Sequence, residues 1–282
     1  MESSQISSAL AIAAATSAGV ADFLAARVAR RLPATLVAAW TQTLGLTLIA
    51  VAFVLAGGGE PSRTDVLMSI LAGISIAIGI GALYRCLAIG PIGVTAPVAA
   101  VGGAAVPVLG AAALGEVLAV VQYFGLLLGL VSVALMAHTP DHAPRSTRSV
   151  TGIAIALLAG VGIGVFGILL DATTHDAGQW PIAIARAVAA AGLWIAIVKT
   201  RASRNVARPD WSLLLPCGLL DGAAMVAFLL ALRSGELSIV AVLTAFYPAA
   251  TIALSSVFDR EKLLPTQWAG LFTAAAAIAL II

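Results

Sequence analysis

The sequence contains very little charge. Only 10% of its 282 residues are charged, whereas 61% are apolar. A soluble domain carries roughly 25% charged residues, so this deficit excludes an ordinary globular core and indicates that the chain folds in lipid. The few basic residues lie in short stretches without interleaved aromatics, a pattern that gives no groove for nucleic acid.

Cysteine and histidine are also scarce. Cys86 and Cys217 both lie inside apolar stretches and form no C-x-x-C pair, which argues against a disulfide framework or a metal site. The three histidines fall at or near expected loops, and the chain contains no H-E-x-x-H or G-x-S-x-G motif and no P-loop. We therefore expect no catalytic residues, no metal and no cofactor, and we expect a protein that is not an enzyme and is not driven directly by ATP.

Long apolar runs account for most of the chain. A membrane helix needs about 20 mostly apolar residues to cross about 30 Å of hydrocarbon. Ten segments meet this requirement, at residues 7–27, 35–56, 66–89, 94–114, 118–138, 150–170, 180–199, 212–233, 238–258 and 264–282. An acid and no basic residue precede the first run, so we interpret that run as a retained helix rather than a signal peptide.

A gapless repeat divides the chain into two similar halves. A shift of 145 positions superposes Glu116, Gln122 and Gly125 on Glu261, Gln267 and Gly270. These matches are informative because Glu and Gln each occur only five times in the chain. The pattern predicts one five-helix repeat at 1–139, a hinge loop at 140–149 and a second five-helix repeat at 150–282. Glu116 and Glu261 fall at helix ends, where an acid can cap the next helix.

Five helices per repeat is an odd number, so the second copy must be inverted relative to the first. The expected fold is an all-α polytopic membrane protein with ten transmembrane helices in two inverted five-helix repeats. Basic residues concentrate in the connections 1–2, 5–6, 7–8 and 9–10, namely Arg27, Arg30, Arg31, Arg145, Arg148, Lys199, Arg201, Arg204, Arg208, Arg260 and Lys262. The positive-inside rule then places these loops in the cytoplasm and both termini outside the cell membrane.

The repeat markers carry a resemblance to a known family. Leu114-Gly115-Glu116 with Gln122 and Gly125, Tyr247-Pro248 with Glu261, Gln267 and Gly270, and Gly218-Leu219-Leu220-Asp221 resemble ten-helix proteins with two EamA domains in the drug/metabolite transporter superfamily. The resemblance implies transport through a path lined by helices one, three, four, six, eight and nine. It also implies cytoplasmic termini, whereas the charge distribution favours external ones.

Two intramembrane charges are the first candidates for the substrate path. Asp221 lies about nine residues into the eighth segment, and a charge near mid-bilayer costs about 2.5–3.5 kcal/mol on insertion scales. Arg186 in the seventh segment is a suitable partner for it. Asp221 is then either half of a structural ion pair or a substrate contact or proton carrier. Asp22, near the end of the first segment, is either solvated near the interface or substrate-facing.

Other polar residues interrupt the apolar runs. Tyr84 and Arg85 end the third segment, where Arg85 either reaches the interface or presents a cation to a substrate. Gln42 belongs to a polar patch in the second segment. Tyr247 and Pro248 lie within the ninth segment, where the proline frees a backbone carbonyl and marks either an ordinary kink or a cavity wall.

Two glycine motifs have packing interpretations. The G-x-G-x-x-G at 162–167 lacks the strand and the acid of a dinucleotide site, so we expect it to serve close packing of the sixth helix. The Gly125-xxx-Gly129 pair serves either packing within the monomer or a homodimer face.

Together these features predict a secondary transporter that exports a small organic metabolite or drug-like solute across the cell membrane by alternating access. The alternatives are a lipid translocase and a membrane-embedded enzyme. The expected partners are a small-molecule substrate and the lipid bilayer, with a homodimer as a further prediction and no nucleic acid.

Overall fold

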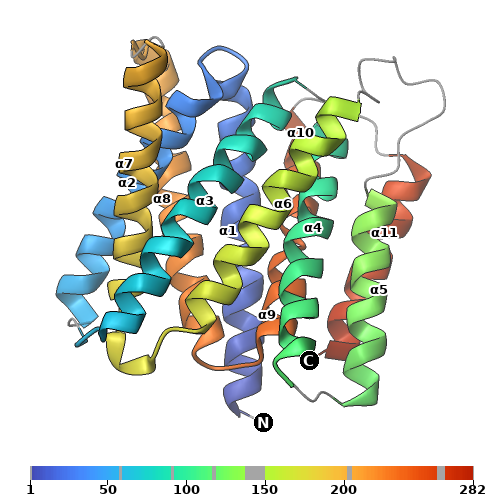
Figure 1. The fold of residues 1–282 in the computed structure, drawn as a ribbon. Coiled ribbons are helices and arrows are strands. Elements are labelled where there is room, and N and C mark those ends of the chain that lie inside the picture. Colours follow the sequence, from blue (N-terminus) through green and yellow to red (C-terminus); the bar gives the residue numbers. More distant parts are fainter. Residues whose placement is uncertain are drawn as a thin grey trace.

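The computed structural model describes residues 2–56, 59–89, 92–115, 119–136, 150–201, 205–258 and 264–281. Throughout these ranges the regular structure is helical, without a strand, as the sequence predicts. The helices are α1 (Glu2–Ala29), α2 (Ala34–Ala56), α3 (Arg63–Ile89), α4 (Ile92–Ala113), α5 (Val120–Met136), α6 (Val150–Asp171), η2 (His175–Ala177), α7 (Trp180–Thr200), α8 (Arg208–Leu232), α9 (Leu237–Thr244), α10 (Tyr247–Phe258) and α11 (Pro265–Ile281). They form one bundle of roughly parallel and antiparallel helices (Figure 1).

Nine of the ten expected segments correspond to a single helix each, and the ninth differs. The segment expected at 238–258 is broken at Ala245 and Phe246 into α9 and α10. Pro248 explains the break, because proline has no N–H to donate to the carbonyl of Thr244. Within the described ranges, seven spans are long and apolar enough to cross a membrane, and α9 with α10 counts as one of them. The remaining helices are α4, α5 and α11.

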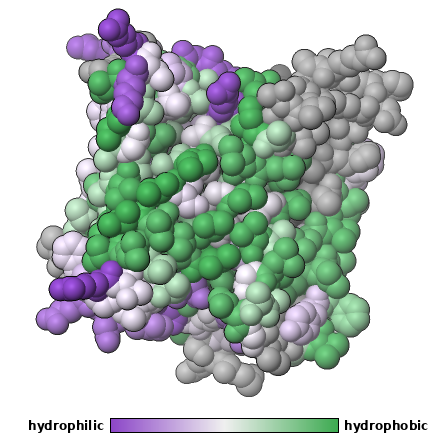
Figure 2. All heavy atoms as spheres, in the orientation of Figure 1, coloured by the Kyte–Doolittle hydropathy of each residue, from purple (hydrophilic) through white to green (hydrophobic). Residues whose placement is uncertain are grey.

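The outer surface of the bundle suits lipid. Figure 2 shows hydrophobic side chains spread across the middle of the visible face and hydrophilic ones gathered at its two ends. The exposed apolar side chains of the bundle include Ile74, Ile78, Leu158 and Phe124. A surface of this kind would aggregate in water, whereas it matches the hydrocarbon of a bilayer.

The helix boundaries repeat along the chain. A shift of 145 residues carries the start of α3 onto that of α8, the start of α4 onto that of α9, and both ends of α5 onto those of α11. In Figure 1 the members of each pair run in opposite directions, and α5 and α11 pack side by side. The two termini lie at the same end of the bundle (Figure 1).

Glycines allow the central helices to cross at very short distances. A Cβ atom on Gly162 of α6 would lie 2.8 Å from the backbone of Gly79 in α3. Gly160, one half-turn earlier, lies equally close to Gly102 in α4. The motif at 162–167 therefore serves helix packing, as expected. Gly129 of α5 likewise contacts Val242 within the same chain.

The two ends of the bundle differ in charge. The end opposite the termini carries Arg27, Arg30, Arg31, Arg85, Lys199, Arg201 and Arg208. At the end with the termini, the carboxylate of Asp65 accepts hydrogen bonds from Ser62 and from the backbone N–H of Thr174 at 2.7 Å. Arg233 donates to Thr173 in the same connection. Partial burial lowers the pKa of Arg233, while Asp65 and Asp171 oppose that shift. These contacts fasten the α6–α7 connection to α3 and to the end of α8.

Candidate functional site

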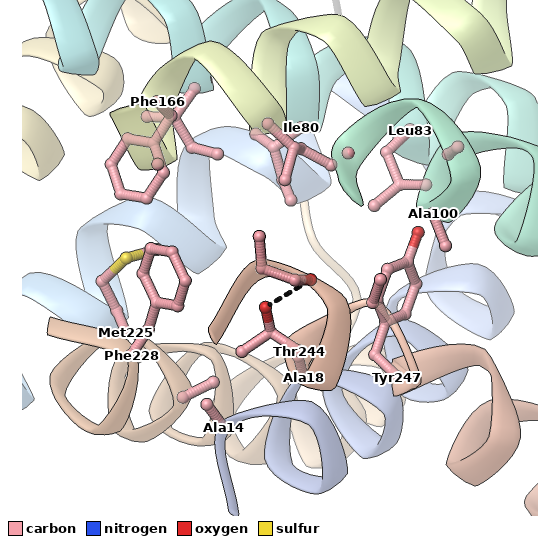
Figure 3. A pocket seen from close by; sticks show the side chains of 18 of the residues that line it. Ala14, Ala18, Ile80, Leu83, Ala100, Phe166, Met225, Phe228, Thr244 and Tyr247 are labelled. Carbon is pink, nitrogen blue, oxygen red and sulfur yellow. Dashed lines mark hydrogen bonds between the residues drawn. The ribbon is translucent and has the colours of Figure 1, made fainter. Parts of the chain in front are cut away.

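A cavity of about 130 Å³ lies in the centre of the bundle. Its described walls come from α1, α3, α4, α6, α8, α9 and the start of α10, which is the set of helices that the resemblance implied. Most of the described lining is apolar, and alanine and glycine alternate with larger side chains. The polar side chains among the described lining residues are Asp22, Asp221, Thr244 and Tyr247. Figure 3 shows the cavity walls at close range.

The lining residues follow helical periodicity. Asp221, Ala224, Met225 and Phe228 all line the cavity and share one face of α8 at spacings of three, four and seven residues. On α1, Asp22 lies four residues after Ala18 on the cavity face. Residues at these helical spacings from Asp221 and Asp22 lie on the same helix faces as the two acids. The sequence could therefore have identified the apolar wall residues from the positions of the acids.

An aromatic wall lies at one end of the cavity and was not anticipated from the sequence. The rings of Phe166 and Phe228 stack with centroids 6.2 Å apart and an interplanar angle of 22°. The side chain of Met225 lies close to these rings in Figure 3. Aromatic faces and a thioether provide polarizable surface for an apolar or cationic ligand.

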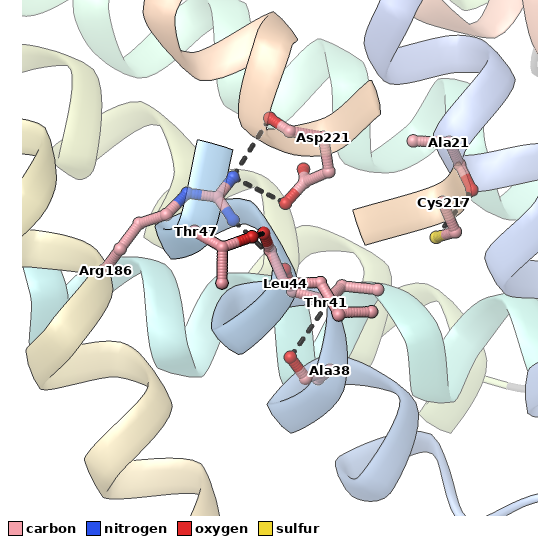
Figure 4. Close-up of polar contacts among 8 residues, drawn as sticks. All are labelled: Ala21, Ala38, Thr41, Leu44, Thr47, Arg186, Cys217 and Asp221. Carbon is pink, nitrogen blue, oxygen red and sulfur yellow. Dashed lines mark hydrogen bonds and ion pairs between the residues drawn. The ribbon is translucent and has the colours of Figure 1, made fainter. Parts of the chain in front are cut away.

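Arg186 and Asp221 form a buried ion pair between α7 and α8. The guanidinium Nη2 donates to the carboxylate Oδ2 of Asp221 at 2.6 Å and to its backbone carbonyl at 3.0 Å. Nη1 donates to the backbone carbonyl of Thr41 in α2 at 3.2 Å (Figure 4). The side chain of Arg186 is almost completely buried. The structure thus brings together the two charges that the sequence suggested as partners.

A glycine makes room for this pair. A Cβ on Gly45 of α2 would collide with the guanidinium of Arg186. Gly222 of α8 packs against the same glycine, since its own Cβ would lie 2.9 Å from the Cα of Gly45. Because Arg186 is fixed at Thr41 and at Asp221, its head group cannot move aside without losing hydrogen bonds.

Asp22 has a different environment from Asp221. It lies on the cavity wall and is 5% exposed, so it is neither a solvated interface residue nor a helix cap. No hydrogen bond or ion pair joins its carboxylate to another group in the described part of the chain. Asp221 lies near enough for the two carboxylates to repel each other. Asp22 is thus an acid that no described residue compensates, on the wall of a mostly apolar cavity.

Further buried polar groups lie outside the cavity lining. Gln42 and Tyr84 are buried, and their polar side-chain atoms have no hydrogen-bond partner among the described residues. The Nε of Arg186 is in the same condition. Unpaired polar groups are costly in a membrane interior. This region of α2, α3 and α7 thus contains buried polar atoms whose hydrogen bonds are not all made within the described residues.

Tyr247 and Pro248 lie where the ninth segment breaks. Tyr247 lines the cavity, and its hydroxyl donates to the backbone carbonyl of Ala96 in α4 at 3.0 Å. Next to it, Thr251 donates to the carbonyl of Gly19 in α1 at 3.0 Å. The broken helix therefore contacts two helices of the first half.

The remaining predicted residues lie elsewhere. Arg85 is exposed on α3 and does not line the cavity. Gly125 and Gly270 are buried in α5 and α11, and the hydroxyl of Ser132 donates to the carbonyl of Gly270 at 2.8 Å. Glu116, Glu261, the side chains of Gln122 and Gln267, and the hinge at 140–149 fall outside the described residues. Within the described ranges, no group of three or more potential metal ligands occurs.

Comparison with known proteins agrees with this architecture. Residues 150–282 match the sequence model of the EamA-like transporter family. A solved crystal structure, described only as that of a protein, shares 18% identity and covers 96% of each chain with a TM-score of 0.76, which shows a common fold. A search of curated proteins found no match. The chain is therefore a multi-pass membrane protein whose residues 150–282 are similar to the EamA-like transporters.

Proposed function

We propose that this protein is a secondary transporter that moves a small organic solute out of the cell by alternating access. The observation that carries the proposal is the central cavity, whose walls come from helices of both halves and include two buried acids. A site shared between two halves can open to either side when the halves rock against each other. The small, mostly apolar cavity favours a compact solute with an apolar body.

Inverted repeats of five helices each would make such rocking symmetric. The repetition of helix bounds at 145 residues and the opposite directions of the paired helices support this arrangement. Arg186 and Thr41 are themselves separated by 145 positions and touch where α2 and α7 cross. A contact between equivalent positions is expected at a pseudo-twofold axis. We assign ten membrane crossings, with α9 and α10 sharing one.

The broken helix provides a part that can rearrange. The hydrogen bond from Tyr247 to Ala96 and the bond from Thr251 to Gly19 link α10 to the first half beside the cavity. Breaking these bonds exposes few polar groups, because each involves one hydroxyl and one backbone carbonyl. Discontinuous helices of this kind are common at transporter binding sites.

Outward transport fits the chemistry of the cavity. A solute with an apolar body enters cells across the bilayer without assistance, so directed transport is useful for its removal. The basic end of the bundle, with Arg30, Arg31 and Arg201, would then face the cytoplasm of a plasma-membrane protein.

The test combines cells and vesicles. Cells that overproduce the protein are challenged with a panel of toxic small aromatic amines, amino-acid analogues and dyes, and are compared with cells that lack it. Each compound against which the protein protects is then labelled and assayed for counterflow in proteoliposomes. We expect chemically unchanged solute to accumulate inside preloaded vesicles. Absence of counterflow for every protective compound would overturn the proposal.

A further inference from the structure

The central cavity contains more negative than positive charge. Asp22 and Asp221 both line it, and among the described lining residues no lysine or arginine is present. Arg186 compensates Asp221 at 2.6 Å from the side of α7, without itself lining the cavity. Among the described residues, none forms an ion pair or hydrogen bond with the carboxylate of Asp22.

A buried carboxylate in an apolar environment requires a positive partner or a proton, because an isolated charge is poorly solvated there. For Asp22 the protein supplies no cation among the described residues, while the cavity in front of it has room for one. The walls near Asp22 are apolar, and the stacked rings of Phe166 and Phe228 lie farther along the same cavity, toward the start of α1.

From these contacts we infer that the cavity binds a small lipophilic organic cation, such as a single-ring ammonium compound, with its charge at Asp22 and its apolar body against the apolar cavity walls. The inference rests on the proposed transport function and specifies its substrate class. Asp221 holds Arg186 in place and is a positioning residue in this scheme. The nearly apolar walls offer few donors for a sugar or an amino-acid carboxylate, and an organic anion would face Asp22 unfavourably.

Binding of labelled benzyltrimethylammonium to the purified full-length chain tests the inference. We expect saturable binding that neopentylbenzene, its uncharged carbon isostere, and benzoate do not displace at equal concentration. Asp22→Asn should weaken binding roughly 30-fold or more, as expected when one partner of a buried charge pair is truncated. Asp22→Glu should retain most of the affinity, which separates loss of charge from loss of fold.

Asp210→Asn is the matched control. Like Asp22, Asp210 is a buried acid, but it lies on α8, pairs with Arg31 and does not line the cavity. This variant should bind like the wild type. Absence of saturable binding, unchanged binding by Asp22→Asn, or equal displacement by the neutral isostere would overturn the inference. Counterflow of another solute without cation binding would overturn only the substrate class. Cation binding at Asp22 without counterflow of any compound would support the site and overturn the transport function.

Discussion

At the scale of single residues, burial decides what an ion pair contributes. Arg186 pairs with Asp221 at 2.6 Å, and both side chains are almost fully buried. Arg31 pairs with Asp210 at 3.4 Å, but its side chain is 65% exposed. Removing one partner of a buried pair leaves an unpaired charge and costs about 3–5 kcal/mol, whereas an exposed pair contributes about 0–1 kcal/mol.

We therefore expect Arg186→Met to lower the thermal unfolding midpoint of the detergent-purified protein strongly. Arg31→Met should lower it less, because the side chain of Arg31 is 65% exposed and its bond to Asp210, at 3.4 Å, is longer. The double variant Arg186→Met with Asp221→Met should recover much of the loss, since it leaves no unpaired charge. Equal midpoints for Arg186→Met and Arg31→Met would show that the buried pair is not a structural element of the fold.

The sequence alone predicted the pairing of Arg186 with Asp221. It did not predict whether other side chains point into the bundle or out of it. Arg186 and Asp221 were identifiable because charges within apolar runs must find each other. The sequence did not show that Asp22 points into the cavity and Arg85 points outward. It also did not show that Phe166 forms part of an aromatic wall. In a soluble helix the polar face marks the outside. Here lipid makes the outer face as apolar as the inner one, so the sequence carries little information about helix rotation.

At the scale of helices, close crossings depend on individual glycines. Gly162 of α6 packs directly on the backbone of Gly79, whereas a Cβ on Gly152 of the same helix would meet no atom of a described residue within 4 Å. Backbone atoms cannot give way as a flexible side chain can. The two positions therefore respond differently to the same added methyl group.

Gly162→Ala should destabilise the protein by about 1–3 kcal/mol, the usual effect of overpacking. Gly152→Ala should be neutral or stabilising by up to about 1 kcal/mol, because alanine favours the helix. Denaturation by a graded increase in the harsh detergent of a mixed micelle compares the two. If Gly152→Ala lowers the stability as much as Gly162→Ala does, then close helix packing at residue 162 does not explain the destabilisation.

The break between α9 and α10 is a second feature of this scale. The sequence located Tyr247 and Pro248 within one apolar segment but did not determine whether that segment bends or breaks. The outcome depends on tertiary contacts, namely the bonds from Tyr247 to Ala96 and from Thr251 to Gly19, which local sequence does not specify. Proline permits the break and the neighbouring helices fix its form.

Pro248→Ala would restore a backbone donor for the carbonyl of Thr244 and favour a continuous helix. We expect transport by this variant to fall by about tenfold or more, equivalent to ~1.4 kcal/mol on the barrier, while its thermal stability stays the same or increases. Pro216→Ala is the control, since α8 continues through Pro216 and this residue does not line the cavity. Initial rates of counterflow, normalised to reconstituted protein, compare the variants. Wild-type rates for Pro248→Ala would exclude a role for the break in transport.

At the scale of the whole molecule, the distribution of charge predicts the orientation in the membrane. The sequence predicts two five-helix halves, and a shift of 145 residues carries the starts of α3 and α4 onto those of α8 and α9. Charge then sets the direction of insertion, because loops rich in lysine and arginine stay in the cytoplasm. The basic end of the bundle includes Arg31 and Arg201, and the opposite end includes Glu60 and Asp176.

Single cysteines at these four exposed positions can determine the orientation. The two native cysteines, Cys86 and Cys217, are completely buried, so wild-type protein should react slowly with a membrane-impermeant thiol reagent. In intact cells, the reagent should label Glu60→Cys and Asp176→Cys but not Arg31→Cys or Arg201→Cys. After the membrane is permeabilised, all four should react, which controls for local accessibility. The reverse labelling pattern would place the termini in the cytoplasm, as the family resemblance implies. In that case the end of the bundle at which Asp65 and Thr174 are hydrogen-bonded would face the cytoplasm. This orientation is opposite to the one that the positive-inside rule predicts for this sequence.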